Sequence, residues 1–87
     1  MPYTIQLDTA LETTLDKLKK KDNSLYHRVI RKIILISNNP KLGKPLRNVL
    51  KGKRRIHVGS FVLFYSIDTN TETVTFLEFE PHDKAYR

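Results

Sequence analysis

The sequence predicts an α+β domain in which a helical hairpin packs on one face of a mostly antiparallel, four-stranded sheet. Short segments with strand-like apolar patterns stand at residues 3–7 and recur along residues 54–80. Two amphipathic segments with helical spacing lie between them, joined so closely that they must form an antiparallel hairpin. With 87 residues, the chain has the length of one domain, and we expect residues 1–87 to form it.

The first strand and the first helix follow directly from the N-terminal pattern. Residues 3–7 alternate between apolar and polar side chains, which is typical of a half-buried strand. Thr9 and Glu12 have the spacing of a capping box, so we expect the helix to begin there. The lysines at residues 19–21 are cations at its C-terminus, where the helix dipole favours them.

The second helix is capped by Asp22 or Asn23, since either side chain can accept from the first free N–H groups. Its apolar stripe at helical spacing consists of Leu25, Val29, Ile30, Ile33 and Ile34. Two asparagines followed by Pro40 end the helix. Residues 41–52 then form a basic connector with room for a short irregular strand.

The C-terminal half reads as three strands. Residues 54–58 alternate basic and apolar side chains, and the Gly-Ser pair at 59–60 predicts a tight hairpin turn. Residues 61–67 are apolar on both faces, which indicates a central strand. Residues 73–80 form the last strand, and 82–87 follow as a short tail.

Charge is unevenly distributed along the chain. Lysine and arginine together number 16 against 9 acidic residues, a net charge of +7. Between residues 23 and 67 no side chain is acidic. The basic residues in this stretch are Arg28, Arg31, Lys32, Lys41, Lys44, Arg47, Lys51, Lys53, Arg54 and Arg55. A field of one sign attracts a polyanion or an acidic protein. The alternative is a solvated basic surface with no specific ligand.

Several classes of function are excluded by composition. The chain has no cysteine, so it holds no disulfide scaffold, thiolate nucleophile or Cys-ligated metal, and a reducing, cytoplasmic setting fits. No apolar run approaches the roughly 20 residues of a membrane span, and the first residues do not resemble a signal peptide. The glycines lack phosphate-loop spacing, and the histidines and carboxylates lack metal-ligand spacing. We therefore expect no cofactor, no metal and no membrane.

One constellation could carry chemistry. Lys53, Arg55 and His57 alternate, so their side chains leave the sheet on one face. His82 and Tyr86 approach them if the last strand pairs with the central strand. These side chains suit RNA cleavage by the 2′-hydroxyl, which needs a base, an acid and cations on the phosphate but no metal. Histidine titrates near neutral pH and serves as either acid or base.

Two motifs resemble those of a known toxin family. KGKRRIHVGSFVLFYSID at residues 51–68 resembles the strand–turn–strand signature of the RelE/ParE toxin superfamily. EPHDKAYR at residues 80–87 resembles its closing motif of a basic residue followed by tyrosine, in a form similar to archaeal RelE proteins. Length, charge and element order agree over essentially the whole chain. The resemblance implies a toxin of a type II toxin–antitoxin pair, closest to RelE.

RelE-like toxins cut mRNA in the ribosomal A site, and the resemblance carries that activity over as an expectation. The catalytic positions fall on Arg55, His57, His82 and Tyr86. We expect His57 or Tyr86 to activate the 2′-hydroxyl and His82 to protonate the 5′-oxygen. Arg55 would stabilise the phosphorane. The residues expected to hold the RNA backbone are Lys51, Lys53 and Arg54.

One departure from the family pattern keeps alternatives open. Val62 stands where the family often has an arginine, which removes a phosphate contact. The chain could instead be a ParE-like inhibitor of DNA gyrase, or a RelE-fold protein without chemistry that only binds its antitoxin. The basic run favours RelE, and Val62 favours lost chemistry. The expected partners are a small acidic antitoxin, mRNA and the ribosome.

Overall fold

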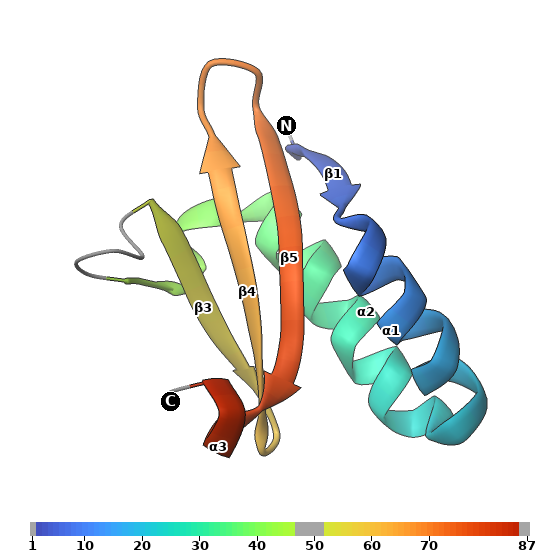
Figure 1. The fold of residues 1–87 in the computed structure, drawn as a ribbon. Helices are drawn as coiled ribbons and strands as arrows, with labels where there is room; N and C mark the ends of the chain where they lie inside the picture. Colours follow the sequence, from blue (N-terminus) through green and yellow to red (C-terminus); the bar gives the residue numbers. More distant parts are fainter. Residues whose placement is uncertain (1, 47–51, 86–87) are drawn as a thin grey trace.

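The computed structural model describes residues 2–46 and 52–85, arranged as a helical hairpin against a twisted sheet (Figure 1). The elements are β1 (Thr4–Leu7), α1 (Thr9–Lys21), α2 (Asn23–Asn38), the 3₁₀ helix η1 (Pro40–Leu42), β2 (Lys44–Pro45), β3 (Lys53–Val58), β4 (Phe61–Asp68), β5 (Thr73–Pro81) and α3 (His82–Ala85). No helix among these described residues is long and apolar enough to cross a membrane.

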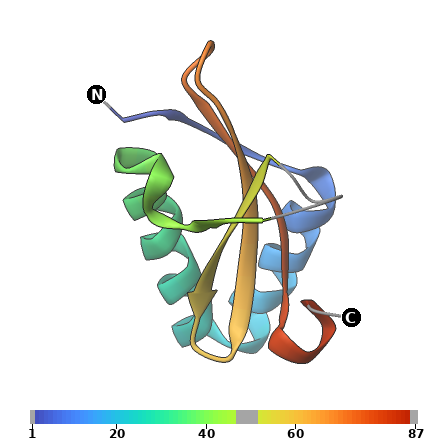
Figure 2. The ribbon, with the colours of Figure 1, turned by 90° about the vertical axis from the view of Figure 1, so that its left-hand side faces the viewer.

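The sheet has five strands in the order β1-β5-β4-β3-β2. β1 pairs with β5 in parallel, and all other neighbours are antiparallel. The α+β class is confirmed, but the expected four strands become five because the connector after η1 contributes β2. Lys44 of this short strand pairs with Arg55. Figure 2 shows the connector running from the end of α2 to the β3 edge of the sheet.

The helix caps correct one expectation and confirm another. Asp8 caps α1, because it is still extended and its carboxylate accepts from the Ala10 N–H at 2.9 Å. Thr9, the expected cap, is already the first helical residue. Asp22 caps α2 and accepts from the Leu25 N–H at 3.1 Å. Both caps satisfy an N–H that the helix itself leaves without a partner.

The core lies between the helical hairpin and the sheet. Its buried residues are Leu11, Leu15, Val29, Ile33, Ile36, Val58, Leu63, Tyr65, Val74, Phe76 and Phe79. Tyr65 is fully buried, and its hydroxyl donates to the Pro40 carbonyl while accepting from the Gly43 N–H, each at 2.8 Å. A Cβ on Gly43 would lie 2.6 Å from the Arg55 carbonyl oxygen, so only glycine lets the connector approach β3 this closely.

A β-bulge in β5 decides which side chains face away from the helices. Phe64 pairs with Glu78, whereas the next residue, Tyr65, pairs with Phe76, so Leu77 is the extra residue. Phe76 and Phe79 both reach the core for this reason, although they are three residues apart. Glu78 therefore lies beside Phe64 on the outer face of the sheet. The bulge thus brings carboxylates to the face that also carries the cations of β3.

Candidate functional site

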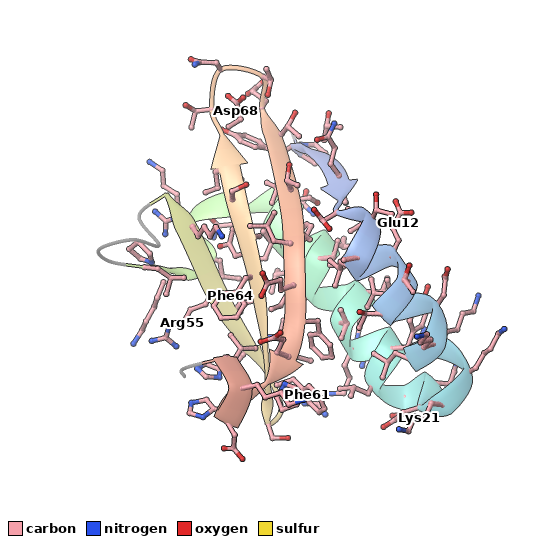
Figure 3. The ribbon with its side chains drawn as sticks, viewed as in Figure 1. Glu12, Lys21, Arg55, Phe61, Phe64 and Asp68 are labelled. Atoms are coloured by element: carbon pink, nitrogen blue, oxygen red, sulfur yellow. The ribbon has the colours of Figure 1, made fainter. Side chains whose placement is uncertain are left out.

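The outer face of the sheet, away from α1 and α2, is built from rows of side chains that cross three strands. In one row Arg55 of β3, Phe64 of β4 and Glu78 of β5 stand opposite one another. The neighbouring row contains His57, Val62 and Glu80. Each row begins with a cationic or titratable group on β3 and ends with a carboxylate on β5. Figure 3 shows Arg55 and Phe64 on this face.

Three of the predicted site residues meet at the end of the sheet where β3 turns into β4. The Nη1 of Arg55 lies 2.9 Å from the Nε2 of His57. A guanidinium only donates hydrogen bonds, so Nε2 of His57 is the acceptor in this contact. The rings of His57 and His82 stack, with centroids 5.7 Å apart and planes 23° from parallel. The predicted approach of His82 to the Arg55–His57 strand is confirmed.

The start of α3 is fixed against the β3–β4 turn. The backbone N–H of His82 donates to the carbonyl of Ser60 at 3.0 Å. Gly59, with φ of +61°, lets this turn close in two residues, as the sequence predicts. The residues after β5, expected as a tail, therefore begin with a short helix that packs on β4 and β5. This contact places the imidazole of His82 over the end of β3.

Val62 gives the site an apolar wall where the family pattern has an arginine. Its side chain is fully buried, on the face away from the helical hairpin. It stands between His57 and Glu80 in the sheet register. A guanidinium at this position would have to displace the groups that now cover Val62. The positive charge on this part of the face therefore comes from β3.

The remaining expected RNA-binding residues take different positions. Lys53 lines a cavity on the outer face. Arg54 points to the opposite face, since neighbours on a strand alternate. Its Nη1 donates to the carbonyls of Lys41 and Gly43, at 3.3 and 2.6 Å. Arg54 thus stabilises the connector and does not lie on the same face as Arg55 and His57. The expected roles of Lys51 and Tyr86 lie outside the described residues.

The cavity on the outer face is a feature that sequence reasoning missed. It has a volume of about 240 Å³ and is lined by Leu46, Lys53, Phe64, Leu77, Glu78, Glu80, Lys84 and Ala85. All carboxylates lie outside the basic stretch in the sequence, yet the fold places Glu78 and Glu80 in the same cavity as Lys53 of that stretch. The signal was the spacing of Phe76 and Phe79, which strict strand alternation cannot bury together.

A second cationic surface lies on α2 beside the cluster. A groove of about 300 Å³ is lined by Arg28, Arg31, Lys32, Leu35, His57, Val58 and Gly59. The polar face of α2 thus continues the positive surface of β3 around the edge of the sheet. Ile34 and Leu35 are about half exposed on the same helix, at 51% and 47%. Charged and apolar groups together make this helix face suited to an amphipathic protein partner.

Comparison with known proteins agrees with the fold and the motifs. The family described as "ParE toxin of type II toxin-antitoxin system, parDE" matches residues 5–86. The putative toxin RelE4 of Methanocaldococcus jannaschii is 36% identical over 86 residues, which cover 98% of this chain and 92% of that protein.

Solved structures share the architecture. A chain of the RelBE2 toxin–antitoxin complex of Mycobacterium tuberculosis is 30% identical, with a TM-score of 0.80, and the match covers 93% of this chain and 99% of that one. A mutant of the E. coli toxin RelE shares the fold at 14% identity, with a TM-score of 0.79 and coverage of 98% and 88%. The family match spans nearly the whole chain, so this protein belongs to the ParE family of type II toxins within the RelE/ParE superfamily that its motifs resemble.

Proposed function

We propose that this toxin is a cytoplasmic endoribonuclease that cleaves mRNA in the ribosomal A site. The reaction is attack of a ribose 2′-hydroxyl on its own phosphodiester, without a metal. The observation that carries the proposal is the cluster of Arg55, His57 and His82. A guanidinium, an imidazole whose Nε2 faces it and a second imidazole stacked on the first lie within one nucleotide's reach.

The contact between Arg55 and His57 suggests how substrate prepares the base. In the unbound protein the guanidinium occupies the Nε2 lone pair of His57. A phosphate offers the guanidinium a charged acceptor and draws it away. Nε2 then accepts the proton of the 2′-hydroxyl while Arg55 holds the non-bridging oxygens. The release of the base is in this way coupled to binding of the phosphate.

Protonated His82 completes the reaction as the acid. The 2′-oxygen forms a bond to phosphorus, the bond from phosphorus to the 5′-oxygen breaks, and His82 gives its proton to the leaving oxygen. The products are a 2′,3′-cyclic phosphate and a 5′-hydroxyl. Lys53 contributes to holding the RNA backbone. Tyr86 remains a candidate to assist the base, and Lys51 a candidate backbone contact.

The expected partner is a small acidic antitoxin. A chain of net charge +7 is complemented by an acidic protein, which speeds association and fixes its orientation. The exposed Ile34 and Leu35, beside the cations of α2, offer the apolar part of such an interface. The M. tuberculosis relative was solved as a toxin–antitoxin complex.

A second candidate is a ParE-like inhibitor of DNA gyrase that cleaves nothing. The matching family favours it by name, and so does the apolar Val62 inside the site. The two candidates make different predictions for mRNA, since only the endoribonuclease breaks it.

The test is primer extension on mRNA from cells that briefly express the chain, and from purified ribosomes mixed with the protein. Wild type is expected to produce breaks within translated regions. His82→Ala should lower cleavage about 100-fold or more, because the leaving oxygen loses its acid. His27→Ala is the matched control, since His27 is an exposed histidine on α2 and its loss should leave cleavage unchanged.

Each other outcome contradicts part of the proposal. Cleavage that survives His82→Ala removes His82 from the mechanism. Growth arrest with intact mRNA, relieved by resistant gyrase, establishes the ParE-like alternative. Neither arrest nor cleavage indicates a RelE fold that only binds its antitoxin.

A further inference from the structure

We propose that Lys44 is a further RNA-binding residue, and that it holds a phosphate next to the scissile one. The proposal rests on the proposed function, because it names a contact of the RNA backbone beside the cluster of Arg55, His57 and His82. Sequence reasoning counted this lysine only among the basic residues of the connector. The structure places it in β2, at the edge of the sheet.

Lys44 lies on the outer face of the sheet, in the row that contains Arg55. The two residues stand directly opposite one another in the antiparallel pairing of β2 with β3. Opposite residues share a face of the sheet, and their Cβ atoms lie about 4.5–5.5 Å apart. Leu46, the next residue but one, lines the outer-face cavity together with Lys53, which is the alternation that an outward Lys44 requires. The row of site residues therefore begins one strand before Arg55.

The backbone on either side of Lys44 is fixed by hydrogen bonds. The N–H of Gly43 donates to the hydroxyl of Tyr65 at 2.8 Å, and the Gly43 carbonyl accepts from Nη1 of Arg54 at 2.6 Å. The N–H of Leu46 donates to a carbonyl of β3 at 2.9 Å. Because Tyr65 is fully buried, these bonds anchor a strand of only two residues to the core. The sheet therefore holds Lys44 at a fixed position beside Arg55.

The pair of Lys44 and Arg55 concentrates positive charge on one face. Like charges directly opposite one another in a sheet are destabilising. The strands β2 and β3 and residues 61–67 of β4 contain no acidic residue. Lys44 is exposed, and no carboxylate within residues 2–46 and 52–85 forms an ion pair with it. A stretch of RNA backbone brings phosphates to both cations, offsets their repulsion and accepts charge-assisted hydrogen bonds from them.

The place of Lys44 in the row indicates which phosphate it holds. Arg55 contacts Nε2 of His57 at 2.9 Å, so the phosphate at Arg55 is the one on which the imidazoles can act. Lys44 stands one strand farther from the histidines, about 4.8 Å beyond β3. Consecutive phosphates of an RNA strand are separated by one sugar, so a strand that crosses from β3 to β2 brings the neighbouring phosphate to Lys44. This lysine therefore contributes to binding, and Arg55 to stabilising the charge that develops at the scissile phosphorus.

The first experiment measures binding of a single-stranded RNA with a 2′-deoxy sugar at the cut, so that it binds without reacting. Lys44→Gln should weaken binding about tenfold at low salt, near the low end for a hydrogen bond to a charged group. The salt slope of the logarithm of the association constant should fall by about 0.7, as expected for one phosphate contact on a single strand. Lys41→Gln is the matched control, because it removes the same charge from an exposed residue of η1. Its salt slope should equal that of wild type.

A second experiment identifies the phosphate. Each phosphate of the same RNA is replaced in turn by a neutral methylphosphonate. Wild type should lose affinity at the scissile phosphate and at one neighbour, whereas Lys44→Gln should lose affinity only at the scissile phosphate. On translating ribosomes Lys44→Gln should raise KM and leave kcat unchanged, as expected when binding is lost equally from substrate and transition state. Arg55→Gln should instead lower kcat.

Protein stability gives a readout that a structural role would move in the opposite direction. Lys44→Gln removes the repulsion with Arg55, so it should unfold at a higher urea concentration than wild type. Circular dichroism follows the unfolding and verifies that each variant is folded. A lower midpoint for Lys44→Gln would mean that the lysine supports the fold, and it would overturn the proposal.

The outcomes separate this proposal from the proposed function. If wild type cleaves mRNA and Lys44→Gln keeps the affinity and salt slope of wild type, the proposal is overturned and the nuclease stands. Equal losses in Lys44→Gln and Lys41→Gln also overturn it, and so does a Lys44→Gln variant that becomes insensitive at the scissile phosphate. If wild type cuts no mRNA but Lys44→Gln alone lowers affinity and salt slope, the nuclease fails and the RNA-backbone contact at Lys44 stands.

Discussion

At the scale of single residues, Tyr65 connects the core to the segment that leads into the site. Its hydroxyl is bonded to both Pro40 and Gly43, so it fastens η1 and the connector to the central strand. We expect Tyr65→Phe to lower the free energy of unfolding by about 1–3 kcal/mol, because a buried N–H and a carbonyl lose their partner. Urea unfolding followed by circular dichroism measures it.

Tyr65 also makes the free energy of unfolding depend on pH. Burial raises the pKa of its hydroxyl, and the Gly43 N–H and the charge of Arg54 lower it by less. Above about pH 10 the unfolded chain loses this proton before the folded chain does, so stability falls as the pH rises. Tyr65→Phe should flatten that fall between pH 9 and 11. Tyr26→Phe is the control, and an equal flattening there would contradict the assignment.

Arg54 and Arg55 show how far a residue's role follows from sequence. Alternation along the strand correctly put Arg55 and His57 on one face. The same alternation puts Arg54 on the opposite face, where two carbonyls of the connector bind it. Those carbonyls are 11 and 13 residues from Arg54 along the chain, and no local sequence pattern predicts such a contact. The family resemblance alone had assigned Arg54 to RNA.

At the scale of elements, local periodicity was enough to predict the helices and the longer strands within a residue or so at each end. It could not predict β2, which has two residues and exists only because it pairs with β3. It also could not predict the bulge at Leu77, since a bulge depends on the partner strand. The carboxylates of the cavity were missed for this reason. The approach of His82 to β3 was predicted correctly, because it follows from the β3–β4 turn and from the antiparallel pairing of β4 with β5.

The tip of the β4–β5 hairpin holds backbone strain. Glu72 has a φ of +52°, a left-handed conformation that costs a residue with a Cβ about 1–2 kcal/mol. Glycine adopts it without that cost but loses about 0.5–1 kcal/mol in chain entropy. We therefore expect Glu72→Gly to stabilise the protein by about 0.5–1 kcal/mol, measured as a higher urea midpoint with an unchanged slope. Glu72→Ala keeps the strain, and a gain of the same size in that variant would mean that the carboxylate is responsible.

At the scale of the whole molecule, folding brings together basic residues that are spread along one stretch of the sequence. Arg28, Arg31 and Lys32 of α2 line a groove together with His57, and His57 in turn contacts Arg55 on β3. A polyanion held at one face should therefore displace counterions through a few particular side chains. The logarithm of the association constant for RNA then falls linearly with the logarithm of salt concentration, with a slope of about 0.7 per phosphate contacted on a single strand.

This distribution allows a test that separates a phosphate contact from general attraction. Arg55→Gln and Lys17→Gln each remove one positive charge, the first from the site and the second from an exposed position on α1. The probe is a single-stranded RNA with a 2′-deoxy sugar at the cut, so that it binds without reacting. Arg55→Gln should weaken binding and reduce the salt slope by about 0.7, because one contact is lost. Lys17→Gln should leave the slope unchanged. Equal changes in both variants would mean that RNA responds to net charge alone, and Arg55 would then not be a phosphate contact.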